Sequence, residues 1–443
     1  MDIQLSDHFT YKKLLKFTFP AIVMMIFTSI YSVVDGVFVS NFVGKTPFAA
    51  LNLVYPVLMM IGAVGLMFGA GGSALVAKTL GEGERKTANR YFSLIVYVAL
   101  GCGVFFALVG QVCITPVASA LGAQGAMLDY SVLYARILLA SMPAFILQMA
   151  FQILLVTAEK PQLGLFFTVG AGVTNIILDF LFIVVFHWGL AGAALATAAG
   201  EIFGGVGPLV YFLRKNSSLL RLTKTKFEGR VLTRTCINGS SEMMSNLAAS
   251  IVNMLYNLQL LKHIGEDGVA AYGVIMYINF IFTGIFFGYS MGSGPIVSYH
   301  YGAQNHVELK NLFLKSLTLM GIAGLCLTAL AVLLANPLVR IFVGYDQGLL
   351  ELTSHGFRLY ALAFLFMGFN IYGSAFFTAL NNGPVSAAIS FSRTLVFETS
   401  AVLILPLLLG INGIWLAVVI ADILALVVTS TFLIKFRSRY HYV

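Results

Sequence analysis

Long apolar runs follow one another along nearly the whole chain. Twelve of them have the roughly 20 mostly apolar residues that a helix needs to cross the hydrocarbon core of a membrane. The runs are continuous and do not alternate between apolar and polar residues, which favours helices over the strands of a barrel. A soluble fold could not bury this much apolar surface, because 59% of the 443 residues are hydrophobic and only 10% are charged. We place the spans at ~14–40, ~48–76, ~91–115, ~131–157, ~162–186, ~189–213, ~233–261, ~270–298, ~312–335, ~356–380, ~384–409 and ~412–434.

The basic residues are concentrated in every second connection between these runs. With both termini in the cytoplasm, 21 of the 26 Lys and Arg residues belong to the cytoplasmic side, and the outer side keeps Lys45, Arg136, Lys262, Arg340 and Arg358. Short loops rich in Lys and Arg remain cytoplasmic when a protein is inserted. We therefore expect a multi-pass protein of the cell membrane with cytoplasmic N- and C-termini. The basic central loop is then an anchor, and no nucleic-acid partner is expected.

The two halves of the chain resemble each other at a spacing of 221 residues. Gly71 aligns with Gly292, Gly81 aligns with Gly302, and "GLAGAALA" from Gly189 aligns with "GINGIWLA" near the C-terminus. Six spans per half give both halves the same orientation, as in a parallel repeat about an axis normal to the membrane. The sequence thus predicts an all-α polytopic membrane protein of twelve transmembrane helices in two pseudo-symmetric six-helix lobes. The N-lobe is placed at 1–215, a cytoplasmic linker at 216–230 and the C-lobe at 231–443.

Acidic residues occur inside the predicted spans, although each costs about 2.5–3.5 kcal/mol at the membrane centre. Asn175 lies one helical turn before Asp179, so both face the same side of the fifth span. With Asp35 and Thr197 they would supply two carboxylates, one amide oxygen and one hydroxyl, and Na⁺ favours such oxygen ligands. A proton can compete for the same site. The alternative is that both acids pack between helices and are satisfied by hydroxyls and amides.

Five further charged residues in the spans have other predicted roles. Glu242 lies in the polar stretch "NGSSEMMSN" and is expected to contact a cationic substrate or a second proton, unless it is only wetted by a cytoplasmic vestibule. Glu201 and Asp422 align at the 221-residue spacing, which indicates a shared structural role. Arg393 and Glu398 share the eleventh span and are expected to pair with each other or across the lobe, in a structural or coupling role.

No catalytic or cofactor-binding arrangement is apparent. The "GKT" at 44–46 lacks the glycine that a phosphate-binding loop needs five residues earlier, where the chain has Val39. The four cysteines stand singly in apolar runs, without the spacing of a metal site. We therefore expect no enzyme activity and no cofactor. If two such lobes move a solute uphill across the membrane, the energy must come from an ion gradient.

Six stretches, through their order and spacing, are similar to a known family: "FPAIVMMIFTSIYSVVDGVFVSNFVG", "GSALVAKTLGEGE", "TNIILDFLFI", "GLAGAALAT", "GPIVSYHYGAQN" and "GINGIWLA". The chain resembles the multidrug and toxic compound extrusion (MATE) family over nearly its whole length. The resemblance implies twelve helices in two lobes that export organic cations and drugs in exchange for Na⁺ or H⁺.

The resemblance also implies site residues. Family members with an N-lobe cation site use an Asp in the first span, an Asn and an Asp in the fifth and a Thr in the sixth, which this chain matches with Asp35, Asn175, Asp179 and Thr197. Other members use an acid in the seventh span, which Glu242 resembles, together with an Asp in the tenth. The tenth span here contains no acid, only polar residues such as Asn370 and Ser374.

The expected function is secondary active multidrug efflux, in which amphipathic, cationic drugs are antiported against Na⁺ or H⁺ by alternating access. The protein is expected to act as a monomer in contact with membrane lipid. One alternative is a flippase for lipid-linked precursors, which would need a cationic cavity to hold pyrophosphate. A major facilitator architecture also has parallel halves, but its basic signature is weak in "LGEGERKTANR". A receptor or membrane enzyme is disfavoured, because no soluble domain or catalytic constellation accompanies the spans.

Overall fold

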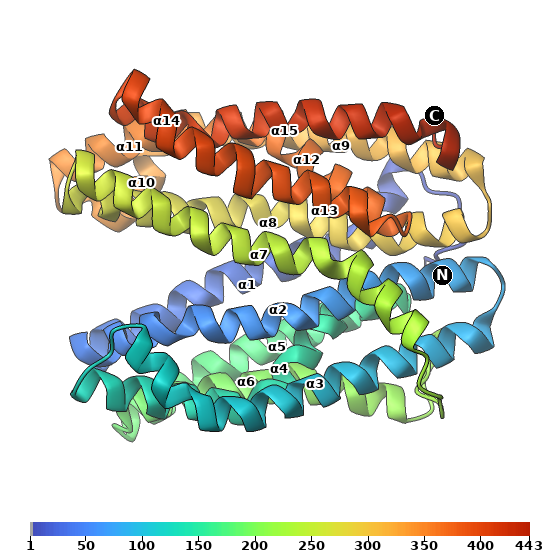
Figure 1. The fold of residues 1–443 in the computed structure, drawn as a ribbon, viewed down its shortest axis with the longest axis horizontal. Coiled ribbons are helices and arrows are strands. Elements are labelled where there is room, and N and C mark those ends of the chain that lie inside the picture. Colours follow the sequence, from blue (N-terminus) through green and yellow to red (C-terminus); the bar gives the residue numbers. More distant parts are fainter. Residues whose placement is uncertain (1–2) are drawn as a thin grey trace.

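The computed structural model describes residues 3–443, without the side chains of Ser32, Val33, Gly36, Val37, Ser40, Asn41 and Lys45. The side chain of Lys45, which we predicted to lie on the outer side, is therefore outside the described part of the structure. Throughout the described part the chain forms helices and loops and no strand (Figure 1). The helices are α1 (Tyr11–Phe42), α2 (Lys45–Gly81), α3 (Arg85–Ala120), α4 (Ala126–Thr157), α5 (Pro161–Asp179), α6 (Gly189–Leu213), α7 (Gly229–His263), α8 (Glu266–Gly302), α9 (His306–Leu333), α10 (Ala335–Val343), α11 (Gln347–Ala361), α12 (Phe364–Ala379), α13 (Gly383–Phe391), α14 (Thr399–Leu409) and α15 (Ile411–Tyr440), with π-helical segments η1 (Phe180–Val185) and η2 (Ser392–Glu398).

The helices are long and apolar enough to confirm the predicted polytopic membrane fold. Within residues 3–443, ten helical stretches qualify as membrane spans, and α11 with α12 forms an eleventh that is bent by 50°. Two of the ten contain a π-helical segment: α5 continues through η1, and η2 joins α13 to α14. The remaining predicted span is α7, which is 35 residues long but less apolar. Its polar residues include Glu242, Asn246 and Asn253, which line an internal cavity.

Buried apolar side chains form two large cores, which lie in the two layers of helices seen in Figure 1. The first core draws its residues from positions 39–220, chiefly from α2, α3, α4 and α6. The second core lies mainly after residue 252, in α8, α9, α11, α12 and α15. The beginning of the chain joins this second core through buried residues from Leu5 to Met24. The boundaries predicted for the two lobes remain a prediction.

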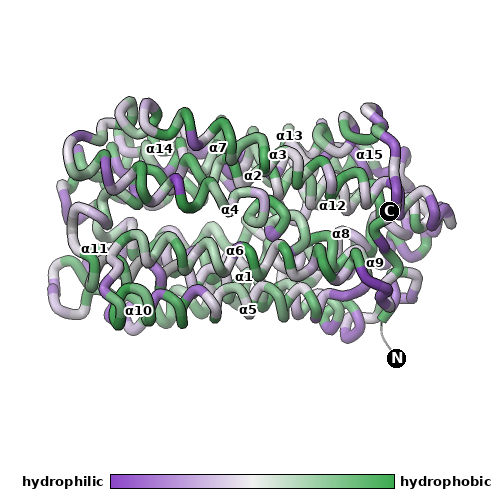
Figure 2. Tube along the Cα trace, turned by 90° about the horizontal axis from the view of Figure 1, so that it is seen from below, coloured by the Kyte–Doolittle hydropathy of each residue, from purple (hydrophilic) through white to green (hydrophobic). Residues whose placement is uncertain are grey.

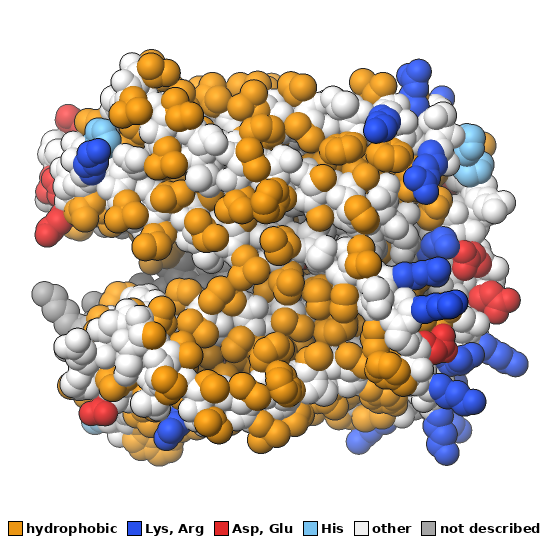
Figure 3. Space-filling model, in the orientation of Figure 1, with side chains coloured by type: hydrophobic (Ala, Val, Ile, Leu, Met, Phe, Trp, Pro, Cys, Tyr) orange, Lys and Arg blue, Asp and Glu red, His pale blue; other side chains and the backbone are white. Residues whose placement is uncertain are grey.

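The two termini lie at the same end of the molecule (Figure 1). Hydrophilic residues gather at this end, whereas the middle of the bundle is predominantly hydrophobic (Figure 2). Lys and Arg side chains are concentrated there too, while the opposite end is hollowed between the two layers (Figure 3). We call the end with the termini the basic end. The apolar belt is the surface that a membrane would cover.

Close contacts between helix backbones join the two layers at the basic end. Gly81, the last residue of α2, packs against the backbone at Tyr299 of α8, and Gly302, the last residue of α8, packs against the backbone at Lys78 of α2. A Cβ atom at either glycine would overlap a carbonyl oxygen of the other helix. The 221-residue spacing aligns these two glycines, so equivalent positions of the two halves pack against each other at this contact. Nearby, Asn381 Nδ2 donates a 3.1 Å hydrogen bond to the carbonyl oxygen of Ala74.

The N-terminal segment, residues 3–10, connects the two layers at the same end. Leu5 N–H donates a 2.5 Å hydrogen bond to Oε1 of Glu159, in the loop between α4 and α5. Phe9 N–H donates a 2.9 Å bond to Oε1 of Glu308, in the first turn of α9, and His8 Nδ1 lies 2.5 Å from Oε2 of the same carboxylate. Leu5 and Phe9 are both fully buried. The segment therefore ties one layer to the other through two acidic side chains.

The α2–α8 contact leads to a prediction for Gly302→Ala. The added methyl group must push the two helices apart, since it meets backbone that cannot rotate away, and overpacking of this kind costs about 1–3 kcal/mol. We expect a lower thermal unfolding midpoint and a longer distance between spin labels at Lys86 and Val307, measured by double electron–electron resonance in a cysteine-free background. Gly273→Ala on the same helix is the control, because no atom lies within 4 Å of its added Cβ. Unchanged label distances in Gly302→Ala would contradict the role given to this contact.

Glu159 gives a prediction about pH. Burial raises the pKa of the Glu159 carboxyl, and the Leu5 N–H bond only partly opposes this rise. A carboxyl whose folded pKa lies above its unfolded value stabilises the fold at low pH, and this stability is lost as the pH rises through the folded pKa. Glu159→Gln, which stays neutral, should unfold at the same temperature as the native protein near about pH 4 and at a higher temperature near about pH 8. The measurement is scanning fluorimetry at a series of pH values, with exposed Glu351→Gln as the control. If the unfolding temperature of Glu159→Gln followed that of the native protein at every pH, the prediction would be wrong.

Candidate functional site

The four residues of the predicted first-lobe cation site lie together between α1, α5 and α6. Asn175 and Asp179 are buried on one face of α5, and Asp179 is the last residue before η1. Asn175 Nδ2 donates a 3.3 Å hydrogen bond to Oγ1 of Thr197 on α6. The carboxyl group of Asp35 on α1 lies beside the carboxyl group of Asp179 and the side-chain amide of Asn175. Three separate helices therefore bring the predicted oxygen donors to one place.

These oxygen atoms lack hydrogen-bond donors. Oδ1 of Asp35, both carboxylate oxygens of Asp179 and Oδ1 of Asn175 are shielded from solvent and accept no hydrogen bond within the described part of the chain. No Lys or Arg among the described residues forms an ion pair with either acid. Two neighbouring carboxylates without donors are strongly unfavourable in a medium of low dielectric constant. The chemistry of the set therefore fits a shared proton or a small cation with a preference for oxygen.

The surroundings of this pair contain residues that the sequence did not reveal. The phenol rings of Tyr31, Tyr55 and Tyr134 lie close enough to interact electrostatically with Asp35. Tyr31 could have been inferred, because it lies one turn before Asp35 on α1. Tyr55 and Tyr134 carry no signal in the sequence, since only the tertiary fold brings α2 and α4 to this place.

Glu201 is held separately from this pair. It lies buried on α6, where Ser141 Oγ of α4 donates a 2.5 Å hydrogen bond to its Oε2. Its aligned residue Asp422 has a basic partner instead, as described below. The two acids therefore occupy corresponding positions with different contacts, and the shared structural role remains a prediction.

A cavity of about 450 Å³ lies between the two layers. Its walls come from α1, α2, α4, α7, α8, α12 and η2, among other elements. The volume falls within the range of sites for drug-sized molecules. Methionine and aromatic side chains make up much of the apolar wall, which the sequence could not specify: Met25, Met149, Met276, Met291, Met367, Tyr272, Phe280, Phe287 and Tyr360.

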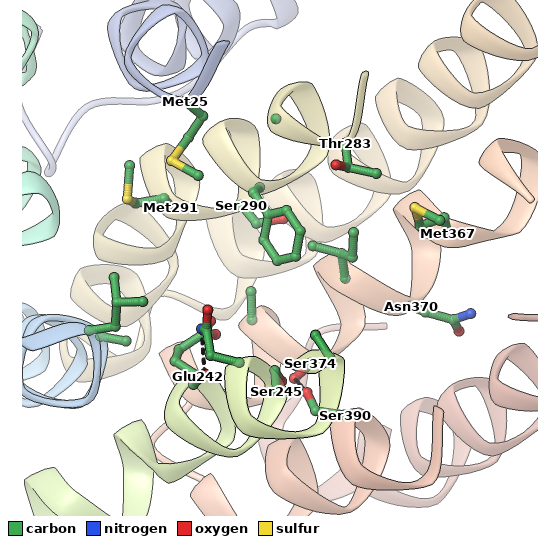
Figure 4. Close-up of a pocket in the computed structure, with 18 of the residues that line it drawn as sticks. Met25, Glu242, Ser245, Thr283, Ser290, Met291, Met367, Asn370, Ser374 and Ser390 are labelled. Carbon is green, nitrogen blue, oxygen red and sulfur yellow. Dashed lines mark hydrogen bonds between the residues drawn. The ribbon is translucent and has the colours of Figure 1, made fainter. Parts of the chain in front are cut away.

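Among the described residues, three charged ones line this cavity, namely Glu242, Arg393 and Glu398. Glu242 is half-buried on α7, across the cavity from Met25 of α1 and Met291 of α8 (Figure 4). Ser245, Asn246, Asn370 and Ser374 also line the cavity, so it combines an apolar wall with a few polar groups. None of Asp35, Asn175, Asp179 and Thr197 lines it, and the first-lobe pair therefore lies outside the cavity.

Arg393 forms an ion pair across the second half of the chain. Its Nε lies 2.6 Å from Oδ1 of Asp422 on α15, and one Nη lies 3.4 Å from Oδ2. Asn370 Nδ2 donates to the backbone oxygen and to Oδ1 of Asp422, at 2.9 and 3.0 Å. Of the two pairings predicted for Arg393, the structure shows the one across the lobe. Glu398 stands on the same π-helical segment and faces the cavity.

The fold and its cavity define a polytopic membrane protein built from two helical bundles around a central compartment. Comparison with known proteins then identifies the family. The MatE family model matches residues 20–181 and again residues 243–404, close to the spacing of the internal repeat. The chain belongs to the MatE family, which confirms the resemblance found in the sequence.

Similar proteins agree with this assignment. The chain is 23% identical over 413 residues to the multidrug export protein MepA of Staphylococcus saprophyticus, covering 91% of this chain and 88% of the relative. It is 22% identical over 431 residues to MepA of Staphylococcus haemolyticus, covering 97% and 94%.

Among solved structures, an outward-facing multidrug resistance MATE transporter superposes with a TM-score of 0.93 at 22% identity, covering 100% of this chain and 99% of the other. A transporter of the MOP superfamily from Pyrococcus furiosus superposes with a TM-score of 0.90 at 22% identity, covering 97% of each chain. These likenesses support the twelve-helix, two-lobe fold.

Proposed function

We propose that this protein is a secondary active multidrug exporter that exchanges amphipathic organic cations for Na⁺ or H⁺ by alternating access. The names of the MepA relatives, which are multidrug export proteins, support the transport of drugs. The observation that carries the coupling proposal is the neighbouring acids Asp35 and Asp179: among the described residues they have no basic partner, and three of their four carboxylate oxygens have no hydrogen-bond partner. Such a pair has a strong preference for a bound proton or cation.

The position of Asp35 offers a physical route from cation binding to movement of the lobes. Asp35 lies in the outer half of α1, beside α5. The first half of the same helix packs along α8, where Gly288 and Gly292 contact the backbone at Ile22 and Thr18. When a cation neutralises the carboxylate pair, α1 and α5 can approach closely; without it the two negative charges repel. A displacement of α1 is then transmitted to its contact with α8.

The cavity supports a substrate that is both apolar and positively charged. Methionine side chains adapt to ligands of different shape, and aromatic rings attract cations through their faces. Glu242 supplies a negative charge within this apolar wall. A ligand cation would contact the Glu242 carboxylate while its apolar body displaces water from the methionine and aromatic surface.

The distribution of charge supports the proposed orientation. If the basic end faces the cytoplasm, both termini are cytoplasmic and the hollow between the layers opens to the outside (Figure 3). The cytoplasmic end is then closed by the α2–α8 contact and the N-terminal segment. We propose that this is the state that releases substrate outward, in a plasma-membrane protein that acts as a monomer.

A flippase for lipid-linked pyrophosphates is less well supported. Such a substrate needs a cluster of basic groups. Arg393 is the one Lys or Arg among the described cavity residues, and its guanidinium already binds Asp422. Two acids, Glu242 and Glu398, line the same cavity, which disfavours a polyanion.

Asp35→Asn and Asp179→Asn test the coupling. Each removes one carboxylate of the pair while keeping its size, so we expect a loss of gradient-driven transport of about tenfold or more, with substrate binding retained. The measurement is efflux of a fluorescent cationic dye from proteoliposomes, with the Na⁺ and proton gradients collapsed independently. Exposed Asp129→Asn on α4 is the matched control. Undiminished coupled transport in both pair variants would refute the coupling role.

Glu242→Gln tests the substrate site. Loss of a charge in a largely apolar cavity should weaken the binding of a cationic dye by about tenfold, equivalent to about 1.4 kcal/mol. A neutral analogue of the same shape should bind with unchanged affinity, because it forms no ion pair. Fluorescence anisotropy with the purified protein measures both. An equal loss for the cationic and neutral ligands would assign Glu242 a role in packing and not in charge recognition.

A further inference from the structure

The two lobes deal with their buried acids in different ways. In the first lobe, Asp35 and Asp179 face each other without a base among the described residues. In the second lobe, Asp422 is fully buried and is paired with Arg393. The side chains of this pair are 17% and 1% exposed, so Arg393 reaches from the cavity wall into the protein interior.

The second-lobe pair is embedded in a network of directional contacts. Arg393 and Glu398 lie on η2, a π-helical segment in the eleventh span, and such segments often occur at functional sites. Asp422 also accepts two hydrogen bonds from Asn370, whose Oδ1 accepts a 2.9 Å bond from Thr429 Oγ1. The carboxylate of Asp422 is thus surrounded by fixed donors, in contrast to the carboxylate of Asp179.

The internal repeat shows what replaces these groups in the first lobe. At the 221-residue spacing, Arg393 corresponds to Gly172 on α5, and Tyr256 on α7 corresponds to Asp35. A Cβ atom at Gly172 would lie 2.5 Å from the ring of Phe27 and 3.2 Å from the ring of Tyr31, so a side chain there would displace these rings. The second lobe therefore has the guanidinium of Arg393 where the first lobe has Gly172, near two acids that have no basic partner among the described residues.

We propose that Arg393 is a built-in cation that keeps Asp422, the fully buried acid of the second lobe, permanently neutralised, so that the exchangeable coupling ion binds in the first lobe alone. This inference rests on the coupling role proposed for Asp35 and Asp179. A guanidinium stays charged throughout the physiological pH range. Its charge therefore balances that of the Asp422 carboxylate without a bound proton. Glu398 remains the acid of this cluster that faces the cavity, where it is available to a cationic substrate.

Several ionisable groups surround Arg393 and must be considered in any titration. They are Asp422 from α15, Glu398 from η2, Tyr256 from α7, Tyr272 from α8 and Tyr360 from α11, with Glu242 in the same cavity. Among the described residues, Asp422 forms the ion pair with the guanidinium, whereas Glu398 and Tyr360 interact with its charge without such a contact. Removal of Arg393 therefore leaves Asp422 and Glu398 as the groups that require a new cation.

The test uses the full-length protein in nanodiscs, with Asp35→Asn and Asp179→Asn combined as the parent so that the first lobe binds no coupling ion. Adding R393Q should give the protein a new dependence on cations: its unfolding midpoint should rise more than that of the parent when Na⁺ is added, or when the pH falls from about 8 to about 5. Adding D422N to R393Q should remove most of this gain. R393K, which keeps the charge, should behave as the parent. Exposed R358Q is the control for the loss of one positive charge.

Each result has a defined meaning. A response of R393Q to Na⁺ and pH that matches the parent would overturn the built-in cation, as would a gain that D422N leaves intact. If R393Q alone fails to fold, a folded R393Q/D422N protein supports the proposal, and failure of the double variant overturns it. Coupled transport by the parent itself would refute the proposed function of Asp35 and Asp179, which is a separate outcome from the titration of the second lobe.

Discussion

A carboxylate in an environment of low dielectric constant needs a donor, a base or a cation, and this requirement organises the interior of the protein. Glu201 is satisfied by the hydroxyl of Ser141. Asp422 is satisfied by Arg393 and Asn370. The pair formed by Asp35 and Asp179 has no basic partner among the described residues, and both oxygens of Asp179 accept no hydrogen bond there. The acids without a basic partner are therefore the ones to which we propose an exchange of ions, whereas Glu201 and Asp422 contact neighbouring helices.

The contacts between the layers determine how a local change of charge can have a global effect. α1 contributes Asp35 to the first-lobe site and also packs along α8 of the other layer. At the basic end, the backbones of α2 and α8 touch through Gly81 and Gly302, and the N-terminal segment binds an acid of each layer. Packed interfaces of this kind have discrete arrangements and do not deform continuously. Alternating access would require these contacts to separate while the hollow at the other end closes.

Much of the fold followed from the sequence, because apolar runs of membrane length are an unambiguous signal. The runs gave twelve spans, including α7, which is too polar to stand out by hydropathy in the structure. They did not reveal the separate short helix α10 or the 50° bend between α11 and α12. These breaks depend on tertiary packing and on local turns that no periodicity records.

The site was only partly accessible from the sequence. The one-turn spacing of Asn175 and Asp179 is a local pattern, whereas Asp35 and Thr197 were grouped with them by the chemistry of their side chains and by the family resemblance, and no spacing along the chain places them there. The pairing of Arg393 with Asp422 joins residues 29 positions apart on different helices, so local spacing could not select it over Glu398. The lining of the cavity likewise depends on which face of each helix turns inward, and helices with apolar residues all round give no hydrophobic stripe to decide this.

The polar character of α7 has a consequence for how the chain enters the bilayer. Glu242, Asn246 and Asn253 face a compartment that exists only when α8 and α12 are in place. A nascent α7 alone would expose these groups to lipid, at a free-energy penalty that cancels part of the gain from its apolar residues. We therefore expect α7 to insert more stably when it is held in the translocon or against the first bundle until later helices emerge from the ribosome. The residues that give the compartment its polar lining are thus the same ones that make the insertion of this helix depend on later helices.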